Sequence, residues 1–318
     1  MPDSSPEAET PKADPEESPW FARKNLLVWI YRVNRRPAGT LFDDDKPLPD
    51  VLDHLLQNLI VAPEVTTGRA HQREWRVGNV EKNEADRSLR GRIGWSRSGE
   101  QLSIAWDADS RSWVDTVVAN EASAAAPFWF EAERRYIGIL KHPSFEPQVL
   151  SSVLEQMLNI AEARTTKNFP TVAWAVDAVG DTAGFRSWLE RTDAVTSLEF
   201  VFERPNPDAE DEFRELLERM DRLKSQKISD RIVAQDPAVG IDKAGLLHDP
   251  VSNAFMAAAG AAFGYIVGKG RRGSRKVKFD QRRNLLTESV EAVGSTWDSA
   301  AEGVRAAVER ALGRSKNG

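Results

Sequence analysis

The chain has no cysteine among its 318 residues. This absence excludes disulfide bonds, thiolate nucleophiles and zinc sites with cysteine ligands, and it suits a cytoplasmic protein, which is the location that we expect. The apolar segment 254–267 is rich in Ala and Gly and is shorter than the roughly 18 apolar residues that a membrane-spanning helix needs. We therefore predict no membrane span.

Patterns that carry catalysis are also missing. The four histidines are not spaced as metal ligands, and the chain has no Walker lysine motif, no GxGxxG and no GxSxG. We predict no catalytic residues, no metal and no cofactor. The sequence favours a non-enzymatic protein over an enzyme.

The charge of the chain is unevenly placed. Residues 1–18 hold six acids and one lysine, and they account for most of the net charge of −6. Their content of Pro, Ser, Glu and Asp predicts a disordered acidic tail over residues 1–19. The remainder is nearly neutral, so a local basic cluster can still attract a polyanion.

Such a cluster follows the segment 254–267. Eight cations accompany a single acid, Asp280, in the stretch 269–283. We predict two strands, 262–267 and 276–279, joined by a basic loop whose glycines Gly268, Gly270 and Gly273 allow close approach to phosphates. The candidate nucleic-acid-binding residues are Lys269, Arg271, Arg272, Arg275, Lys276, Lys278, Arg282 and Arg283. The alternative is a solvated hairpin, or one that pairs with the acidic tail.

A second basic set surrounds Trp95. Arg90 and Arg92 alternate with apolar residues in a predicted strand, and Arg87 and Arg97 flank them. Arginines and an aromatic residue on one sheet face are typical of a nucleic-acid-binding surface. A solvated strand face is the alternative explanation.

The hydrophobic pattern predicts an α+β protein. Short runs between turn residues indicate an antiparallel, β-rich domain over 20–132. Residues 135–203 show a β-α-β-α-β order, which predicts a ferredoxin-like α/β domain over 133–294 that also contains the basic hairpin.

The final segment, 295–318, is predicted to hold one helix. Its apolar residues Trp297, Ala301, Val304, Val308 and Ala311 form a heptad-like seam of about two heptads. The seam can pack on the body of the chain or on a partner helix. We therefore consider a homodimer through this helix, and a protein-interaction module is one alternative function.

A second alternative is a Mg²⁺-dependent nuclease. Asp177 and Glu199 fall on neighbouring predicted strands, and paired carboxylates can hold Mg²⁺. Isolated acids at strand ends explain the same residues without a metal.

Three stretches of the C-terminal third carry a resemblance. These are LEFVFERPNP (198–207), KAGLLHDPVSNAF (243–255) and FGYIVGKG (263–270). Their order resembles poorly characterised bacterial and prophage proteins, including RexA-like phage-exclusion proteins. This resemblance implies a dimeric, DNA-associating protein that acts in phage defence with a protein partner.

Taken together, the sequence predicts a DNA-binding protein that contacts mainly phosphates. The hairpin 269–283 is the predicted contact, and DNA is favoured over RNA. A nearly neutral body with one dense basic cluster is the feature on which this prediction depends.

Overall fold

The computed structural model consists of two antiparallel sheets flanked by helices. It describes residues 26–37, 49–68, 72–97, 100–107, 112–119, 122–166, 172–204, 213–290 and 296–315. The predicted tail 1–19 and His71 lie outside these ranges. No helix in the described part of the chain is both long enough and apolar enough to cross a membrane.

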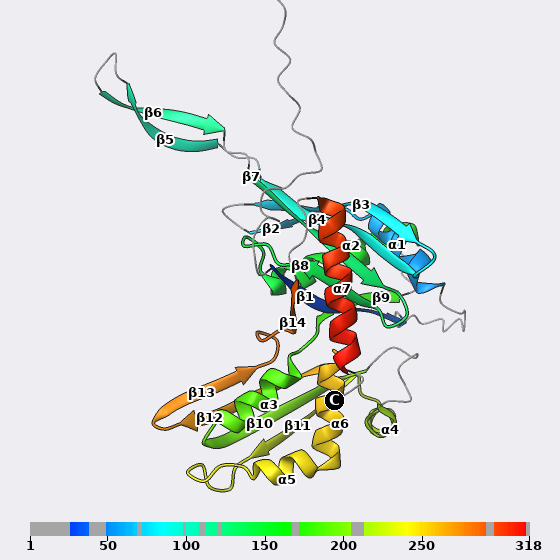
Figure 1. Ribbon diagram of the computed structural model, residues 1–318, viewed down its shortest axis with the longest axis vertical. Coiled ribbons are helices and arrows are strands. Elements are labelled where there is room, and N and C mark those ends of the chain that lie inside the picture. The colour runs from blue at the N-terminus through cyan, green and yellow to red at the C-terminus, as the bar shows by residue number, and fades with distance from the viewer. Residues whose placement is uncertain are drawn as a thin grey trace, which may run out of the picture.

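The larger sheet has eight strands and draws them from both ends of the chain (Figure 1). Its strand order is β14 (Thr287–Val290), β1 (Leu26–Pro37), β8 (Tyr136–Leu140), β7 (Ala122–Glu131), β4 (Ser88–Arg97), β3 (Arg73–Asn83) and β2 (Val65–Thr67). The eighth strand, β9 (Val172–Ala178), also pairs with β1. The twelve-residue β1 therefore joins β14, β8 and β9 into one sheet.

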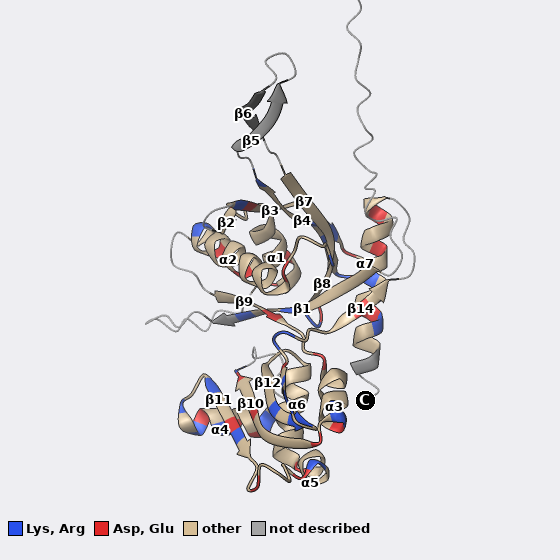
Figure 2. Ribbon diagram, turned by 90° about the vertical axis from the view of Figure 1, so that its left-hand side faces the viewer, with Lys and Arg blue, Asp and Glu red and all other residues tan. Residues whose placement is uncertain are grey.

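Helices cover both faces of this sheet (Figure 2). Alternate residues of a strand point to opposite faces. Trp29, Tyr31 and Val33 of β1 accordingly enter the core with α1 (Val51–Ile60) and α2 (Pro147–Thr165). Val28 and Ile30 enter a second core with α7 (Trp297–Ser315). The strand is thus buried on both sides, as its continuous apolar run requires.

The smaller sheet has four strands and helices on one face. Its order is β11 (Lys227–Val233), β10 (Ala194–Glu203), β12 (Gly264–Arg272) and β13 (Arg275–Asp280). Alternate residues Leu198, Phe200 and Phe202 of β10 are buried. They share a core with α3 (Thr182–Arg191), α4 (Arg214–Leu223), α5 (Lys243–His248) and α6 (Pro250–Gly260). A separate two-stranded ribbon consists of β5 (Glu100–Asp107) and β6 (Ser112–Ala119).

The two sheets are joined by buried polar contacts. Arg32 of β1 donates from Nη1 to the Ala261 carbonyl at 2.9 Å, and its guanidinium lies 3.9 Å from the centre of the Phe263 ring. The Gln281 side chain is buried, accepts from the Ile266 N–H and donates to the Ala259 carbonyl. A side chain at Gly180 would collide with Gln281. The Arg32 contacts and the close approach of Gly180 to Gln281 join the two sheets, whereas the Gln281 hydrogen bonds lie within the small-sheet unit.

The mixed α+β architecture and the antiparallel, β-rich first half agree with the sequence analysis. The predicted β-α-β-α-β order over 135–203 is confirmed as β8, α2, β9, α3 and β10. The prediction that these strands share one ferredoxin-like sheet is wrong, because β8 and β9 pair with β1 while β10 pairs with β11 and β12. Strands β7 and β8 pair directly across the predicted boundary at 132/133. Local periodicity reports burial, whereas strand partners depend on contacts between distant segments.

Element bounds follow the sequence closely in most places. Helix α4 is followed by Lys224 in a left-handed conformation, and Lys227 begins β11. Helix α6 ends at Gly260, and β12 begins at Gly264 and runs to Arg272, so it starts two residues later and ends five residues later than the strand predicted over 262–267.

Candidate functional site

The basic cluster forms a two-stranded hairpin in which the charges lie on strands. β12 and β13 extend to Arg272 and Arg275 and are joined by Gly273 and Ser274. Gly273 has a φ of +55°, a conformation that glycine adopts without strain in such two-residue turns. The basic loop predicted between 267 and 276 is therefore wrong. The strand register fixes these cations in place.

That register sets cations directly opposite one another. Lys269 pairs with Lys278, Arg271 with Lys276, and Arg272 with Arg275. Directly opposed residues on antiparallel strands have Cβ atoms about 4.5–5.5 Å apart, and like charges there destabilise the hairpin. The hairpin thus concentrates six positive charges at a cost to its own stability.

The two faces of the hairpin have different surroundings. A side chain at Gly268 would collide with Trp188, and one at Gly270 with Thr192, because α3 crosses this face. These glycines accommodate α3, so the prediction that they allow close approach to phosphates is wrong for them. We call the opposite face, which carries Lys269, Arg271, Lys276 and Lys278, the basic face.

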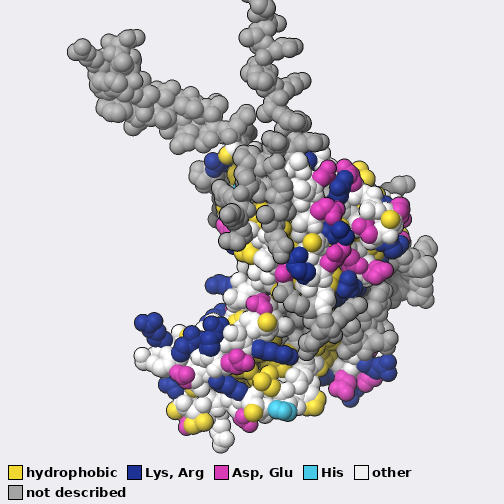
Figure 3. All heavy atoms as spheres, viewed as in Figure 1, with side chains coloured by type: hydrophobic (Ala, Val, Ile, Leu, Met, Phe, Trp, Pro, Cys, Tyr) yellow, Lys and Arg dark blue, Asp and Glu magenta, His cyan; other side chains and the backbone are white. Residues whose placement is uncertain are grey.

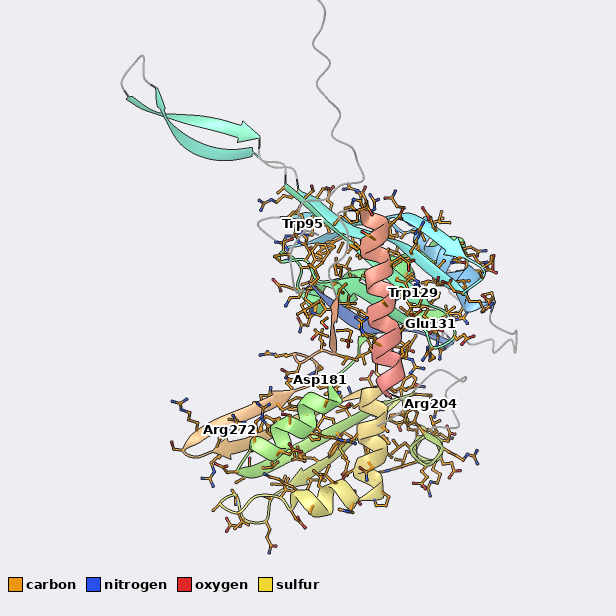
Figure 4. All side chains as sticks on the ribbon, viewed as in Figure 1. Trp95, Trp129, Glu131, Asp181, Arg204 and Arg272 are labelled. Atoms are coloured by element: carbon orange, nitrogen blue, oxygen red, sulfur yellow. The ribbon has the colours of Figure 1, made fainter. Side chains whose placement is uncertain are left out.

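Three of the four side chains of the basic face are exposed, and Arg271 is half-buried. The face continues over β10 and β11, where Ser197 pairs with Lys269, and Glu199 pairs with Arg231. Figure 3 shows, from the α3 side, Lys and Arg side chains gathered at the hairpin end of the small sheet. Figure 4 places Arg272 at the hairpin tip.

Half of the eight predicted cations have partners that fix them. Arg271 donates to the Pro237 carbonyl at 2.7 Å, and Arg272 to the Arg191 carbonyl at the end of α3 at 2.8 Å. Lys278 and Arg282 both bind the buried carboxylate of Asp280, at 3.2 and 3.0 Å. Burial raises the pKa of Asp280, but hydrogen bonds from Arg282 and Lys278 outweigh it and lower that pKa overall.

The other half are exposed and unpaired. Within the described residues, no hydrogen bond or ion pair engages the side chains of Lys269, Arg275, Lys276 or Arg283. These four cations are available to an external anion. The sequence alone did not separate them from the four that are held.

The second predicted basic set has a structural role. Arg90 lies 2.6 Å from Glu81 and 3.1 Å from Asp298 of α7. The Arg92 guanidinium stacks 4.2 Å from the centre of the Trp297 ring, also in α7. Both predicted nucleic-acid-binding residues on β4 therefore anchor the last helix.

The seam of that helix is covered by its own chain. Ala301, Val304, Val308 and Ala311 are buried against the larger sheet, where Figure 4 shows Trp129 behind α7. The predicted seam thus packs on the body of the chain, the first of its two expected arrangements. A homodimer through the same seam would have to displace the helix.

A cleft opens where the small sheet meets the large one. It has a volume of about 230 Å³ and is lined by residues from α2, β9, β10, β12 and the turn after β13. Asp177 and Glu203 supply carboxylates, and Arg282 supplies a guanidinium that stacks 4.4 Å from the centre of the Tyr265 ring. Because Arg282 also binds Asp280, the partner of Lys278, the cleft adjoins the basic face.

The carboxylates proposed for Mg²⁺ do not lie on neighbouring strands. Asp177 is on β9 of the large sheet and receives a hydrogen bond from Asn34, whereas Glu199 is on β10 of the small sheet. The predicted neighbouring-strand arrangement is wrong. Over the described ranges, no group of three or more His, Asp or Glu side chains is placed to hold a metal ion.

A buried polar network lies within the large-sheet core. His54 Nε2 is 2.6 Å from Glu162 Oε2, which also accepts from Asn58 at 3.0 Å and Trp174 at 3.2 Å. Burial raises the pKa of Glu162, but the hydrogen bonds from His54 and Asn58 outweigh it and lower that pKa to about 2. None of these residues lines the cleft, and the network links α1, α2 and β9.

The fold and the exposed cations define an α+β protein with a basic hairpin. Residues 95–305 match the family described as a domain of unknown function, DUF4747. This match covers more than half of the chain, which therefore belongs to that family. It includes the whole small sheet and the hairpin. A search of curated proteins finds no match to the chain.

Proposed function

We propose that this protein is a non-enzymatic DNA-binding protein that contacts phosphates through the β12–β13 hairpin. The observation that carries the proposal is the register, which sets three cation pairs directly opposite one another. Lys269 and Lys276 on the basic face are the primary contacts. Arg275, at the hairpin turn on the α3 side, and Arg283, after β13, contact a backbone that passes the ends of the hairpin, and the side chains of Arg271, Lys278 and Arg282 add to the local field.

The physical argument concerns the cost of these pairs. Like charges directly opposite one another destabilise a sheet, and the hairpin has three such pairs, with Gly270 opposite Val277 between the first and the second. When phosphates lie beside these cations, attraction between opposite charges replaces the repulsion between the cations. The counterions condensed on the nucleic acid are released at the same time. A polyanion is therefore the ligand that the charge pattern fits best.

The hairpin geometry favours weak sequence specificity. Because α3 packs on one face of the hairpin through Trp188 and Thr192, the hairpin cannot enter a groove with both faces in contact. The basic face instead lies along a phosphate backbone, and contacts to phosphates carry no direct sequence information.

The biological role is proposed from the resemblance alone. Three stretches, at 198–207, 243–255 and 263–270, resemble RexA-like phage-exclusion proteins, and their described residues lie on or beside β10, α5, α6 and β12 of the small sheet and its helices. A cytoplasmic role in phage defence, with a homodimer or a second protein as partner, follows from that resemblance. A nuclease is disfavoured, because Asp177 and Glu199 lie in different sheets.

The test is a DNA-binding titration with two double variants. Lys269→Gln with Lys276→Gln removes two unpaired charges from the basic face, and Arg219→Gln with Arg222→Gln removes two exposed charges from α4. Each lost phosphate contact lowers the slope of log K against log salt by about 0.9. We expect the hairpin variant to lose affinity and about two units of slope, and the α4 variant to match the native chain.

Equal binding by both variants would contradict the proposal. Substitution of Arg271 or Arg272 is a poorer test, because each also removes a hydrogen bond to a backbone carbonyl of the fold.

A further inference from the structure

The cleft between the two sheets has the chemistry of a site for one unpaired nucleobase. We infer that a base displaced from its stack enters this cleft while the flanking phosphates lie on the hairpin. This inference rests on the proposed function and deepens it, because it specifies nucleic acid with unpaired nucleotides as the preferred ligand.

The charge of the cleft argues against an anion inside it. Two carboxylates, Asp177 and Glu203, line it with one guanidinium, Arg282. Each already has a partner: Lys227 lies 2.9 Å from Glu203, Asn34 donates to Asp177, and Arg282 binds Asp280. The lining therefore offers no spare positive charge to a phosphate group. A neutral ring with N–H donors suits the site, because carboxylates accept from the exocyclic amino groups of bases.

The remaining lining suits the flat faces of a ring. Val176, Ala178, Ala262 and Leu285 contribute apolar surface, and Tyr265 lies beside them with Arg282 stacked on its ring. Sequence-tolerant recognition of single strands commonly stacks bases on aromatic rings and arginine planes. The volume of about 230 Å³ is below the roughly 300–1,000 Å³ of pockets for drug-sized ligands, which fits one base rather than a dinucleotide.

The position of the cleft connects it to the hairpin. Asp280 ends β13 and holds both Lys278, on the basic face, and Arg282, on the cleft wall. A backbone that follows Lys276 and Lys278 is therefore led towards the cleft mouth. The bond from Arg32 to the Ala261 carbonyl and the backbone bonds that join Val179 to Leu286 and Asp181 to Asn284 link the two walls of the cleft.

The experiment compares a blunt duplex with the same duplex carrying a short single-stranded overhang that contains 2-aminopurine. Ser151→Leu fills the cleft from α2, and Ser152→Leu places the same side chain on the neighbouring exposed position outside the cleft. We expect the native chain and Ser152→Leu to bind the overhang substrate at least tenfold more tightly and to change the 2-aminopurine fluorescence. Ser151→Leu should lose both effects and keep its affinity for the blunt duplex.

The outcomes separate the two proposals. Salt-dependent binding of both substrates with equal affinity would overturn the base site and leave the phosphate-binding proposal intact, as would identical behaviour of Ser151→Leu and Ser152→Leu. Failure of the native chain to bind either substrate at low salt would overturn both. Preference for the overhang that Ser151→Leu abolishes supports the base site.

Discussion

Two basic strand regions of this protein have similar composition and different roles. On β4, Arg90 and Arg92 are held by Glu81, Asp298 and Trp297, and they dock α7 on the large sheet. On β12 and β13, Lys269 and Lys276 oppose other cations and have no described partner of opposite charge. The comparison teaches that the number of cations does not show their role. A cation bound to a carboxylate or stacked on an aromatic ring stabilises the fold, whereas a cation without such a partner is available to a ligand.

The largest loss of stability is expected when α7, the helix that contacts Arg90 and Arg92 of β4, is removed. Deletion of residues 295–318 exposes the large-sheet face that α7 buries with Val304, Val308 and Leu312. Burial of each such side chain contributes about 1.5–3 kcal/mol, so the loss should exceed about 5 kcal/mol and unfold or aggregate the chain. Circular dichroism and light scattering provide the measurement. A stable, folded truncation would show that the β4 arginines and α7 are not structural partners.

The buried carboxylate of Glu162, which accepts hydrogen bonds from His54, Asn58 and Trp174, should dominate the dependence of stability on acid pH. The pKa of Glu162 is about 2 in the folded chain against an ordinary value of 4.5. The stabilisation is complete above pH 4.5 and is lost as the pH falls towards 2, and it amounts to about 3 kcal/mol. Glu162→Gln should remove this dependence and lower the stability at pH 7 by a similar amount.

Urea denaturation at a series of pH values measures the Glu162 effect. Glu146→Gln, at an exposed position before α2 whose side chain makes no capping bond, is the control and should keep the native profile. If the stability of the Glu162→Gln variant depended on pH as that of the native chain does, Glu162 would not be the group that causes the loss of stability at acid pH.

A smaller loss is expected from an engaged arginine of β4. Arg92→Ala removes the stacking on Trp297 and should lower the stability by about 1 kcal/mol. Arg97→Ala, on the same strand, should change it by less than about 0.5 kcal/mol. Neither should change the salt slope of DNA binding. If the Arg92→Ala variant folded but bound DNA more weakly, β4 would be part of the DNA-binding surface.

The smallest stability effect should have the opposite sign. Lys269→Gln with Lys276→Gln relieves two opposed cation pairs and should raise the stability by a few tenths to about 1 kcal/mol. Arg219→Gln with Arg222→Gln should leave it unchanged. Thermal unfolding at low salt gives the comparison. Destabilisation of the hairpin variant would mean that these lysines have partners in the fold.

Much of the secondary structure could be predicted from the sequence. The β-α-β-α-β order over 135–203 is observed, the strands predicted over 262–267 and 276–279 overlap β12 and β13, and the helix predicted within 295–318 is α7. Strand partners could not be predicted, because β1 pairs with strands from three distant parts of the chain. The continuous apolar run of β1 indicates that both of its faces are buried and gives no information on which strands pair with it.

The candidate site was predicted in location and not in detail. Eight cations beside Asp280 marked the hairpin, but only the register shows that they oppose one another. The sequence analysis assigned Gly268 and Gly270 to close approach of a phosphate. In the structure, the absence of side chains at these positions leaves room for Trp188 and Thr192. No local sequence pattern predicts the cleft, because its walls come from α2, β9 and β12, which are far apart in the sequence.

The most direct test of the central claim is a salt titration of DNA binding by the native chain. Four unpaired cations, Lys269, Arg275, Lys276 and Arg283, predict a slope of log K against log salt near −3.6 or steeper, from about −0.9 per phosphate contact. Fluorescence anisotropy with a labelled duplex measures it between low and physiological salt. A slope of that size supports phosphate binding by the hairpin. No binding at low salt, or an affinity independent of salt, would contradict the account.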